Sequence, residues 1–444
     1  MQKLNLKPRK RAFTLPTSVQ MDAALAVPTV KGSGLLKYGR HAYYLMNFQT
    51  GKGLNVSIGH LDIIRPGWKR LRTSAEAGGQ QLSLRNLFSA KYHYGFNLLE
   101  QVMLMTVPHT ATPLGDGKFI INLWSWFGCI LIDVKQETAS YYLMEDLPDQ
   151  HVLGSQQWFD AKSGDLYAMS YVLKDSLGRI RDPGHAVPFR VFKHRLDADG
   201  TDTVWEGELA DYMHDIQLNA TMQYGVVCEL GMYKNQSDKM LPSKVLVFDL
   251  QNKRHWILEE FIVAAHACFD PVEPNVVYFS NHNFEFEHSD MVTLLKKGSY
   301  SVRFHGPAAI YKYELTPDGP KQLGVYTQED FFRLTNMHVF LHRGRKMIVA
   351  MGFPDVVFLI DAADMRFIRK IVVKDPVSIN HLYSRKPSLI GTIALSPDGD
   401  QLFVHTTRSF QVVDIDSGEP LFMRDCFRHH TCFNHMAVST DVNW

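Results

Sequence analysis

The sequence has little net charge of either sign. Its 444 residues contain 47 Lys and Arg against 46 Asp and Glu, which gives a formal net charge of +1. A nucleic-acid-binding domain normally carries a basic patch or stripe, so this balance argues against a nucleic-acid partner. The hydrophobic fraction of 45% and the aromatic fraction of 12% are enough for a packed core, and they exclude a wholly disordered chain.

The sequence also lacks a long apolar run. The longest, residues 119–132, is interrupted by Asn122 and Ser125. It is shorter than the roughly 20 residues that span a bilayer, so we expect no integral membrane segment. The basic residues near the N-terminus are followed by polar residues and Pro16 rather than by an apolar segment. This order argues against a secretory signal.

Cysteine is scarce. The chain has five cysteines, widely spaced and without a CxxC pair: Cys129, Cys228, Cys268, Cys426 and Cys432. An odd and dispersed set does not predict a disulfide framework, and it fits a protein of the reducing cytoplasm.

Short β-rich runs dominate, and long helical patterns are few. The runs are rich in Val, Ile, Tyr and Phe and end in turn signals, which is typical of strands. The predicted strands are residues 118–123, 129–133, 190–195, 224–229, 244–249, 276–280, 309–314, 346–351, 357–361, 401–405 and 409–414. They recur with a period of about 40 to 70 residues, which indicates a propeller or a solenoid. Residues 393–422 show one unit most clearly, with three strands joined by two turns, as in an antiparallel propeller blade.

Alignment of the chain on this unit predicts seven blade starts. They lie at residues 108–109, 156–157, 213–214, 265–266, 337–338, 391–392 and 434–435, and five of the seven carry a histidine. The sequence therefore predicts an all-β fold, a single seven-bladed β-propeller over residues 35–444. A large irregular β-sandwich is the alternative.

The last blade is cut short, because only nine residues follow His435. We expect residues 35–47 and 54–59 to supply its missing strands, so that N- and C-terminal strands close the ring and leave no free edge. Residues 1–34 then form an N-terminal extension. We expect residues 65–105 to form a partly helical insertion over one face. It is either a lid or an ordinary surface loop. Residues 285–303 are a second long segment outside the repeat.

Residues at equivalent blade positions face each other across the axis of a propeller. The five histidines of the blade starts are therefore expected to converge: His109, His214, His266, His338 and His435. Crowded imidazoles stay neutral, and neutral imidazole is a common ligand of zinc, copper, iron and nickel. We predict one divalent metal ion held by four of the five, and polar lining of the channel or misaligned blades are the alternatives. Fe(II) is favoured because an octahedral ion with four histidine ligands keeps open positions, while Mn, Cu and Zn are further candidates.

Part of the chain, residues 113–233 followed by Ala265-His266, resembles the carotenoid cleavage oxygenases. Residues 114–118 are similar to their early blade, residues 159–167 resemble the segment after their first iron histidine, and residues 213–216 resemble the segment that holds the second. His266 can stand for the third. The resemblance implies a seven-bladed propeller that holds non-haem Fe(II) with four histidines. This chain departs from the family at Gln156, where the first iron histidine would fall. It also lacks a recognisable segment for the fourth histidine, so His338, His435 and His109 would have to substitute.

These patterns predict a metal-dependent enzyme. The expected reaction is that of a non-haem Fe(II) oxygenase or oxidoreductase, with dioxygen at the open position and a hydrophobic or aromatic small molecule as substrate. Aromatic residues that could line the pocket are Trp124, Trp126, Phe127, Trp158, Phe284 and Phe286. Residues 281–288 mix histidines and aromatics and could extend this site, although a solvated loop is the simpler interpretation. A metal Lewis-acid lyase, cyclase or hydrolase is one alternative. A non-catalytic interaction module with incidental histidines is the other.

Overall fold

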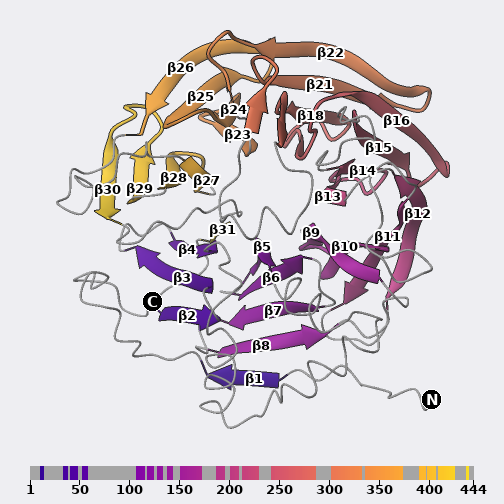
Figure 1. Cartoon of the computed structure of the whole chain (residues 1–444), viewed down its shortest axis with the longest axis horizontal. Helices are drawn as coiled ribbons and strands as arrows, with labels where there is room; N and C mark the ends of the chain where they lie inside the picture. The colour runs from indigo at the N-terminus through magenta and orange to yellow at the C-terminus, as the bar shows by residue number, and fades with distance from the viewer. Residues whose placement is uncertain are drawn as a thin grey trace. The chain divides into compact units, whose positions relative to one another are not determined.

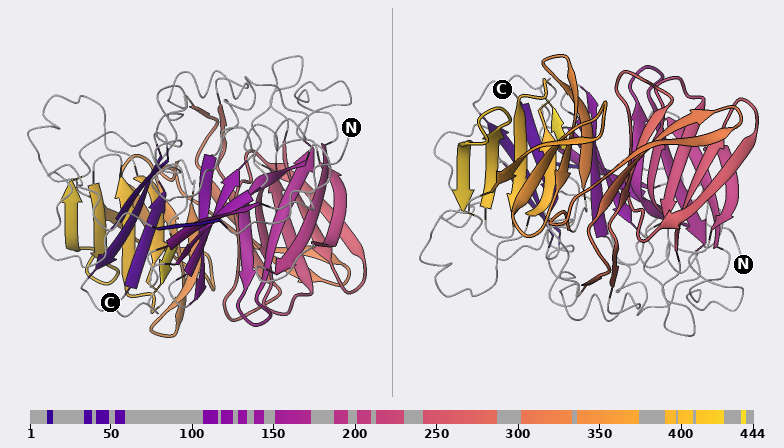
Figure 2. Two further views of the ribbon diagram at one scale, coloured as in Figure 1. Left: turned by 90° about the horizontal axis from the view of Figure 1, so that it is seen from below. Right: turned by 90° about the horizontal axis from the view of Figure 1, so that it is seen from above.

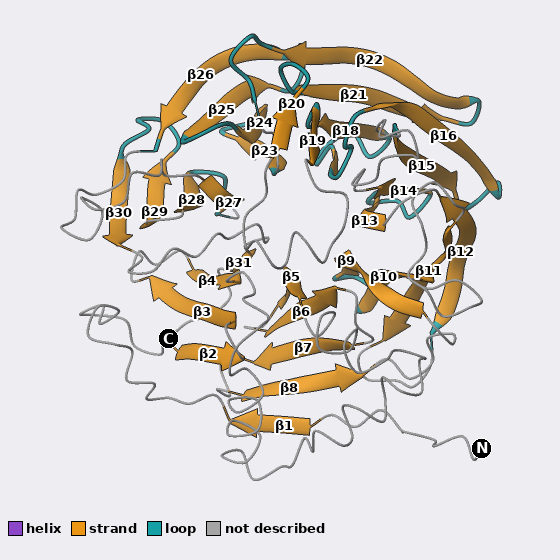
Figure 3. Cartoon of the chain, in the orientation of Figure 1, coloured by secondary structure: helices purple, strands orange, loops and turns teal. Residues whose placement is uncertain are grey.

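The chain is all-β in the computed structural model (Figure 1). The structure describes residues 11–14, 34–38, 41–48, 53–58, 107–115, 118–124, 128–133, 138–143, 151–172, 187–195, 201–209, 213–229, 242–286, 302–332, 336–373, 390–396, 398–406, 409–425 and 437–439. These residues form strands and loops and contain no helix (Figure 3), hence none long and apolar enough to cross a membrane. The predicted insertion at residues 65–105 lies outside the described residues.

The chain divides into two compact units. The first comprises Met1–Asp182, Val187–Glu208 and Ser439–Trp444, and the second comprises Pro183–Ala186 and Leu209–Val438.

The first unit is built on three sheets. One sheet has the order β1-β8-β7-β6-β5, with β1 (Arg11–Thr14), β5 (Val107–Gly115), β6 (Lys118–Trp124), β7 (Gly128–Asp133) and β8 (Thr138–Leu143). The next has the order β12-β11-β10-β9, with β9 (His151–Asp160), β10 (Asp165–Val172), β11 (Val187–Arg195) and β12 (Asp202–Leu209). The third has the order β2-β3-β4-β31, with β2 (Gly34–Tyr38), β3 (His41–Phe48), β4 (Gly53–Ile58) and β31 (Ala437–Ser439), of which only Ser439 falls in this unit.

The second unit has four four-stranded antiparallel sheets in chain order. The first holds β13 (Met213–Leu218), β14 (Tyr224–Glu229), β15 (Ser243–Asp249) and β16 (Arg254–Phe261). The second holds β17 (Ala267–Phe269), β18 (Val276–Asn281), β21 (Ala309–Thr316) and β22 (Gly319–Thr327). The third holds β23 (Met337–His342), β24 (Arg345–Met351), β25 (Val356–Asp361) and β26 (Arg366–Val372). The fourth holds β27 (Ile390–Leu395), β28 (Gln401–Thr406), β29 (Ser409–Asp414) and β30 (Pro420–Asp425). A two-stranded sheet, β19 (Phe284–Phe286) with β20 (Val302–Phe304), follows β18 and precedes β21.

Apolar cores lie between successive sheets of the second unit. Figure 2 shows the strands of these sheets in two further views. Every residue of β14 and β18 is buried, whereas the fourth strands β16 and β26 expose much of their length. A strand buried on both faces is stable only between two neighbouring layers, and each fully buried Val or Phe contributes about 1.5–3 kcal/mol. The first strands of successive sheets adjoin, β13 with β17, β17 with β23 and β23 with β27. At Gly225 a side chain has no room, because a Cβ would lie 2.2 Å from the Phe248 ring.

The strand predictions are largely confirmed. Residues 224–229 and 409–414 are β14 and β29 at the expected bounds. The expected pairing of the chain ends also holds, since β2, β3 and β4 share a sheet with β31, which follows His435. In the expected N-terminal extension, Arg11–Thr14 forms β1 and pairs with β8.

Two local predictions were wrong. The blade start expected at residues 156–157 lies inside β9, which begins at His151. A register shift in its pairing with β10 places extra residues in β9 ahead of Gln157. The sequence signal for a strand is therefore interrupted there, although the strand continues. The second prediction placed residues 285–303 outside the repeated strands. The two ends of this segment instead pair with each other, in β19 and β20.

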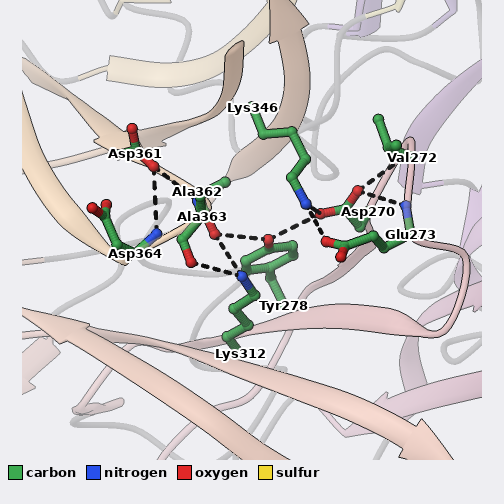
Figure 4. Close-up of polar contacts among 10 residues, drawn as sticks. All are labelled: Asp270, Val272, Glu273, Tyr278, Lys312, Lys346, Asp361, Ala362, Ala363 and Asp364. Carbon is green, nitrogen blue, oxygen red and sulfur yellow. Dashed lines mark hydrogen bonds and ion pairs between the residues drawn. The ribbon is translucent and has the colours of Figure 1, made fainter.

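Polar contacts join the second and third sheets of the second unit at one edge of their core (Figure 4). Lys312 Nζ donates to the carbonyls of Ala362 and Ala363, at 2.9 and 3.0 Å. The Tyr278 hydroxyl lies 3.1 Å from both Ala362 O and a carboxylate oxygen of Asp270. Burial lowers the pKa of Lys312, and the nearby Lys346 ammonium adds to this effect. The ammonium and the hydroxyl therefore satisfy main-chain oxygens that the sheet ladder does not use.

We predict that Lys312→Met destabilises the protein, because the two carbonyls lose their donor while the apolar stem is kept. The free energy of unfolding, measured in urea, should fall by about 1–3 kcal/mol. Lys321→Met is the matched control, since Lys321 is exposed on β22 of the same sheet, and it should change stability by less than about 0.5 kcal/mol. Equal stabilities of the two variants would contradict the role assigned to Lys312.

Candidate functional site

Two of the predicted histidines are in contact in the second unit. His214 is the second residue of β13, and His266 directly precedes β17. Their ring centroids lie 4.7 Å apart with the planes at 74°. Both residues are buried, with 5% and 7% of their surface exposed. The contact follows from the adjacency of β13 and β17, the first strands of neighbouring sheets.

The backbone on each side of His266 is held by the β13 strand. His214 Nδ1 donates to Ala265 O at 2.8 Å, and a carboxyl oxygen of Asp215 accepts from Ala267 N at 2.8 Å. A carbonyl acceptor requires the proton on Nδ1 of His214, so Nε2 carries the lone pair of that ring.

The backbone of His266 itself is fixed by Ser280 in β18. Its N–H donates to Ser280 Oγ at 3.1 Å, and its carbonyl accepts from Ser280 N at 2.9 Å and from Ser280 Oγ at 3.1 Å. Two neighbouring strands therefore determine where the His266 ring can lie. Such rigid support is a property of functional sites that must hold a ligand in one geometry.

Burial shifts the pKa values of His214 and Asp215, which are neighbours on β13, in opposite directions. It lowers the pKa of His214 to about 4, against the raising effect of the bond to Ala265, so the ring is neutral at pH 7. It raises the pKa of Asp215 to about 7, against hydrogen bonds from Ala267 and Gln217 that favour the charged form. A neutral imidazole is the form that binds a metal ion.

A third histidine, His282, belongs to the same cluster. Its ring centroid lies 5.7 Å from that of His266, and only 3% of the residue is exposed. The interpretation of residues 281–288 as a solvated loop was wrong here, because the His282 and Asn283 N–H groups bond Val263 O and Ile262 O. The usable signal was its place directly after β18, an entirely buried strand.

The structure places the other predicted ligands apart from this pair or leaves them outside its description. His338 is half-buried on β23, and its Nε2 donates to Ile393 O on β27 at 3.0 Å. Burial lowers the pKa of His338 as well. His109 lies on β5 in the first unit, but its side chain is outside the described part, as is all of His435. Of the two blade starts without histidine, Gln156 and Thr392 are both buried, at 5% and 0% exposure.

Within the described ranges, no three or more His, Cys, Asp or Glu side chains are grouped so that they could hold a metal ion. His214 and His266 would therefore supply two nitrogen ligands, and further ligands would have to come from residues that the structure does not describe. Among the aromatic residues predicted for a pocket, Phe284 lies beside the cluster, with its ring 5.3 Å from that of His282. Trp158 instead packs edge-on against Tyr167 in the first unit.

Comparison with known proteins identifies no family. No family model matches the chain, and no curated protein matches it. One solved structure to which it is similar is that of a functionally unknown protein from Desulfotomaculum acetoxidans DSM 771. The two share 10% identity at a TM-score of 0.42, over 73% of this chain and 82% of that chain. A similarity at this level carries no information on activity, and the resemblance to carotenoid cleavage oxygenases stays a prediction.

The opposite pKa shifts of His214 and Asp215 predict a pH dependence of stability. His214 titrates near 4 when folded and 6.5 when unfolded, so its contribution is lost as pH falls through this range. Asp215 titrates near 7 when folded and 3.8 when unfolded, so its contribution is lost as pH rises. The two slopes oppose each other in the native protein. Asp215→Asn removes the contribution of the carboxyl and leaves that of His214. Between pH 4 and 6.5 the free energy of unfolding of this variant should therefore rise by up to about 3 kcal/mol more than that of the wild type.

The measurement is urea unfolding at half-unit pH steps. Asparagine can still accept from Ala267 N, which keeps the backbone contact of Asp215 in place. His214→Gln should give the opposite change of slope, since it leaves only the carboxyl to titrate. Parallel stability curves for all three proteins would show that burial does not shift these groups as described.

Proposed function

We propose that this chain is a metal-dependent enzyme on a seven-bladed β-propeller, with a divalent transition metal ion bound at His214 and His266. The observation that carries the proposal is the contact of two buried imidazoles at 4.7 Å. The bond from His214 Nδ1 to a main-chain carbonyl adds to it, because metal-bound histidines commonly donate their second nitrogen in this way.

The propeller part of the proposal is supported by the order of the sheets. The described part of the chain contains seven sheets of four or five strands, with one further two-stranded sheet. In the second unit the sheets follow each other in sequence, and their first strands adjoin. The sheet that contains β2, β3, β4 and β31 joins strands from both ends of the chain. These are the features by which a propeller avoids exposed edges.

His435 is the next ligand we propose, because it belongs to the second unit, as His214 and His266 do. Fe(II) is the first ion to test, since the resemblance to carotenoid cleavage oxygenases favours it. When bound, Fe(II) would supply open positions for dioxygen, whereas a redox-inert ion would serve as a Lewis acid.

We predict that His214→Ala and His266→Ala each weaken metal binding at least about tenfold, since each would remove a ligand from a shared ion. Anaerobically purified protein is loaded with Fe(II), Mn(II), Cu(II) or Zn(II), desalted and analysed for metal, and affinities are measured by calorimetry. His255→Ala is the control, because His255 is an exposed histidine on β16 of the same unit. Wild-type protein that retains none of the four metals would sink the proposal.

A second candidate function, a non-catalytic interaction scaffold, is favoured by a different observation. His214 and His338, the second residues of β13 and β23, each donate to a main-chain carbonyl outside their own sheet, those of Ala265 and Ile393. A repeated bond of this kind is sufficient to explain histidines at equivalent positions. If His214→Ala and His338→Ala both lower stability and neither changes metal content, the scaffold is the better explanation.

A further inference from the structure

A series of aromatic contacts leads away from the histidine cluster. The His282 ring lies 5.3 Å from Phe284, and Phe284 lies 6.1 Å from Phe304. Phe304 in turn lies 5.4 Å from Phe332 and 5.9 Å from Phe353, measured between ring centroids. All of these residues belong to the second unit.

Exposure increases along this series. His282 and Phe284 are buried, at 3% each, while Phe304 and Phe332 are half-buried and Phe353 is 39% exposed. The contacts therefore connect the interior position of the histidine cluster with the surface of the unit.

The rings are presented by three separate segments. Phe304 lies on β20, which pairs with β19 beyond the end of β18 and β21 (Figure 3). Phe332 follows β22, and Phe353 lies in the loop between β24 and β25. Backbone hydrogen bonds fix these segments, from Ala308 N to Phe331 O at 2.6 Å and from Gly352 N to Val356 O at 2.7 Å. These bonds hold the backbone beside Phe332 and Phe353 in place.

The geometry of the rings suits a planar apolar ligand. Phe304 meets Phe284 at 83° and Phe332 at 74°, both edge to face, so neither neighbour is stacked parallel to the Phe304 ring. Phenylalanine offers no hydrogen-bonding group, so recognition would rest on shape and ring stacking. Phe353 is the most exposed ring of this series, at 39%. One exposed ring is far below the several hundred Å² of a typical protein-binding patch, which favours a small molecule over a partner protein.

We infer that Phe304, Phe332 and Phe353 form a subsite that binds the planar aromatic ring of a small-molecule ligand beside the histidine cluster. This inference rests on the proposed function for its role, because it names the substrate class of that same site. Ring binding itself requires no metal, so the two can be tested apart.

The experiment uses metal-free full-length protein and two probes of similar size, 2-naphthol and its saturated counterpart decahydro-2-naphthol. Binding is followed by calorimetry and by saturation-transfer NMR. We expect 2-naphthol to bind saturably and at least about fivefold more tightly than the saturated probe, because stacking adds to area burial only for the aromatic ring. Phe353→Leu should abolish this preference while it keeps an apolar side chain.

Phe367→Leu is the matched control, because Phe367 is 45% exposed on β26 and its ring contacts Phe358 rather than this series. It should bind both probes as the wild type does. Absence of saturable naphthol binding, no preference for the aromatic probe, or equal losses in both variants would overturn the inference. Naphthol binding without any metal binding would instead remove the proposed metal site and leave the ring subsite intact.

Discussion

The structure of the second unit depends on sheets that are apolar on both faces. β14 and β18 have no exposed residue, so neither of their sheets could stand alone in water. Each sheet must be covered by the next one, and the main-chain polar groups at the ends of the strands then lie near the covered edge. Side chains from the neighbouring sheet satisfy them, as His214 does at Ala265 and Lys312 does at Ala362. The same requirement therefore explains both the apolar cores and the unusual burial of titratable groups beside them.

The burial of His214 next to Asp215 affects the protonation of both groups and the net charge of the core. Each group is driven toward its neutral form, since desolvation disfavours both charges. A neutral imidazole with a protonated carboxyl binds as many protons as an imidazolium with a carboxylate. Burial of both groups in adjacent positions thus changes the total proton count little, although it rearranges where the protons reside. The candidate site obtains a neutral nitrogen ligand in this way without an added net charge in the core.

Much of this could be predicted from sequence because the signals are local. The strand at residues 409–414 is marked by its own Val and Phe residues and by the turn that follows, and the contact of His214 with His266 follows from aligned strand starts. Other features depend on tertiary context. The extra residues in β9 conceal its start, and His282 lies in a polar stretch that only the neighbouring backbone makes buried. The alignment also placed the backbone of His338 without fixing its side chain, which bonds Ile393 instead of joining the pair.

The two bonds that β13 makes on either side of His266 have a further consequence for how this segment can vary. Both bonds are made to main-chain atoms, Ala265 O and Ala267 N, so they do not depend on the side chains at those positions. Any residue small enough for the buried space would preserve them, except proline at position 267, which has no N–H to donate. A change in length would not, because one inserted residue between β16 and His266 would move the imidazole out of line with both contacts. The spacing of this connection is therefore a stricter constraint on related sequences than its composition.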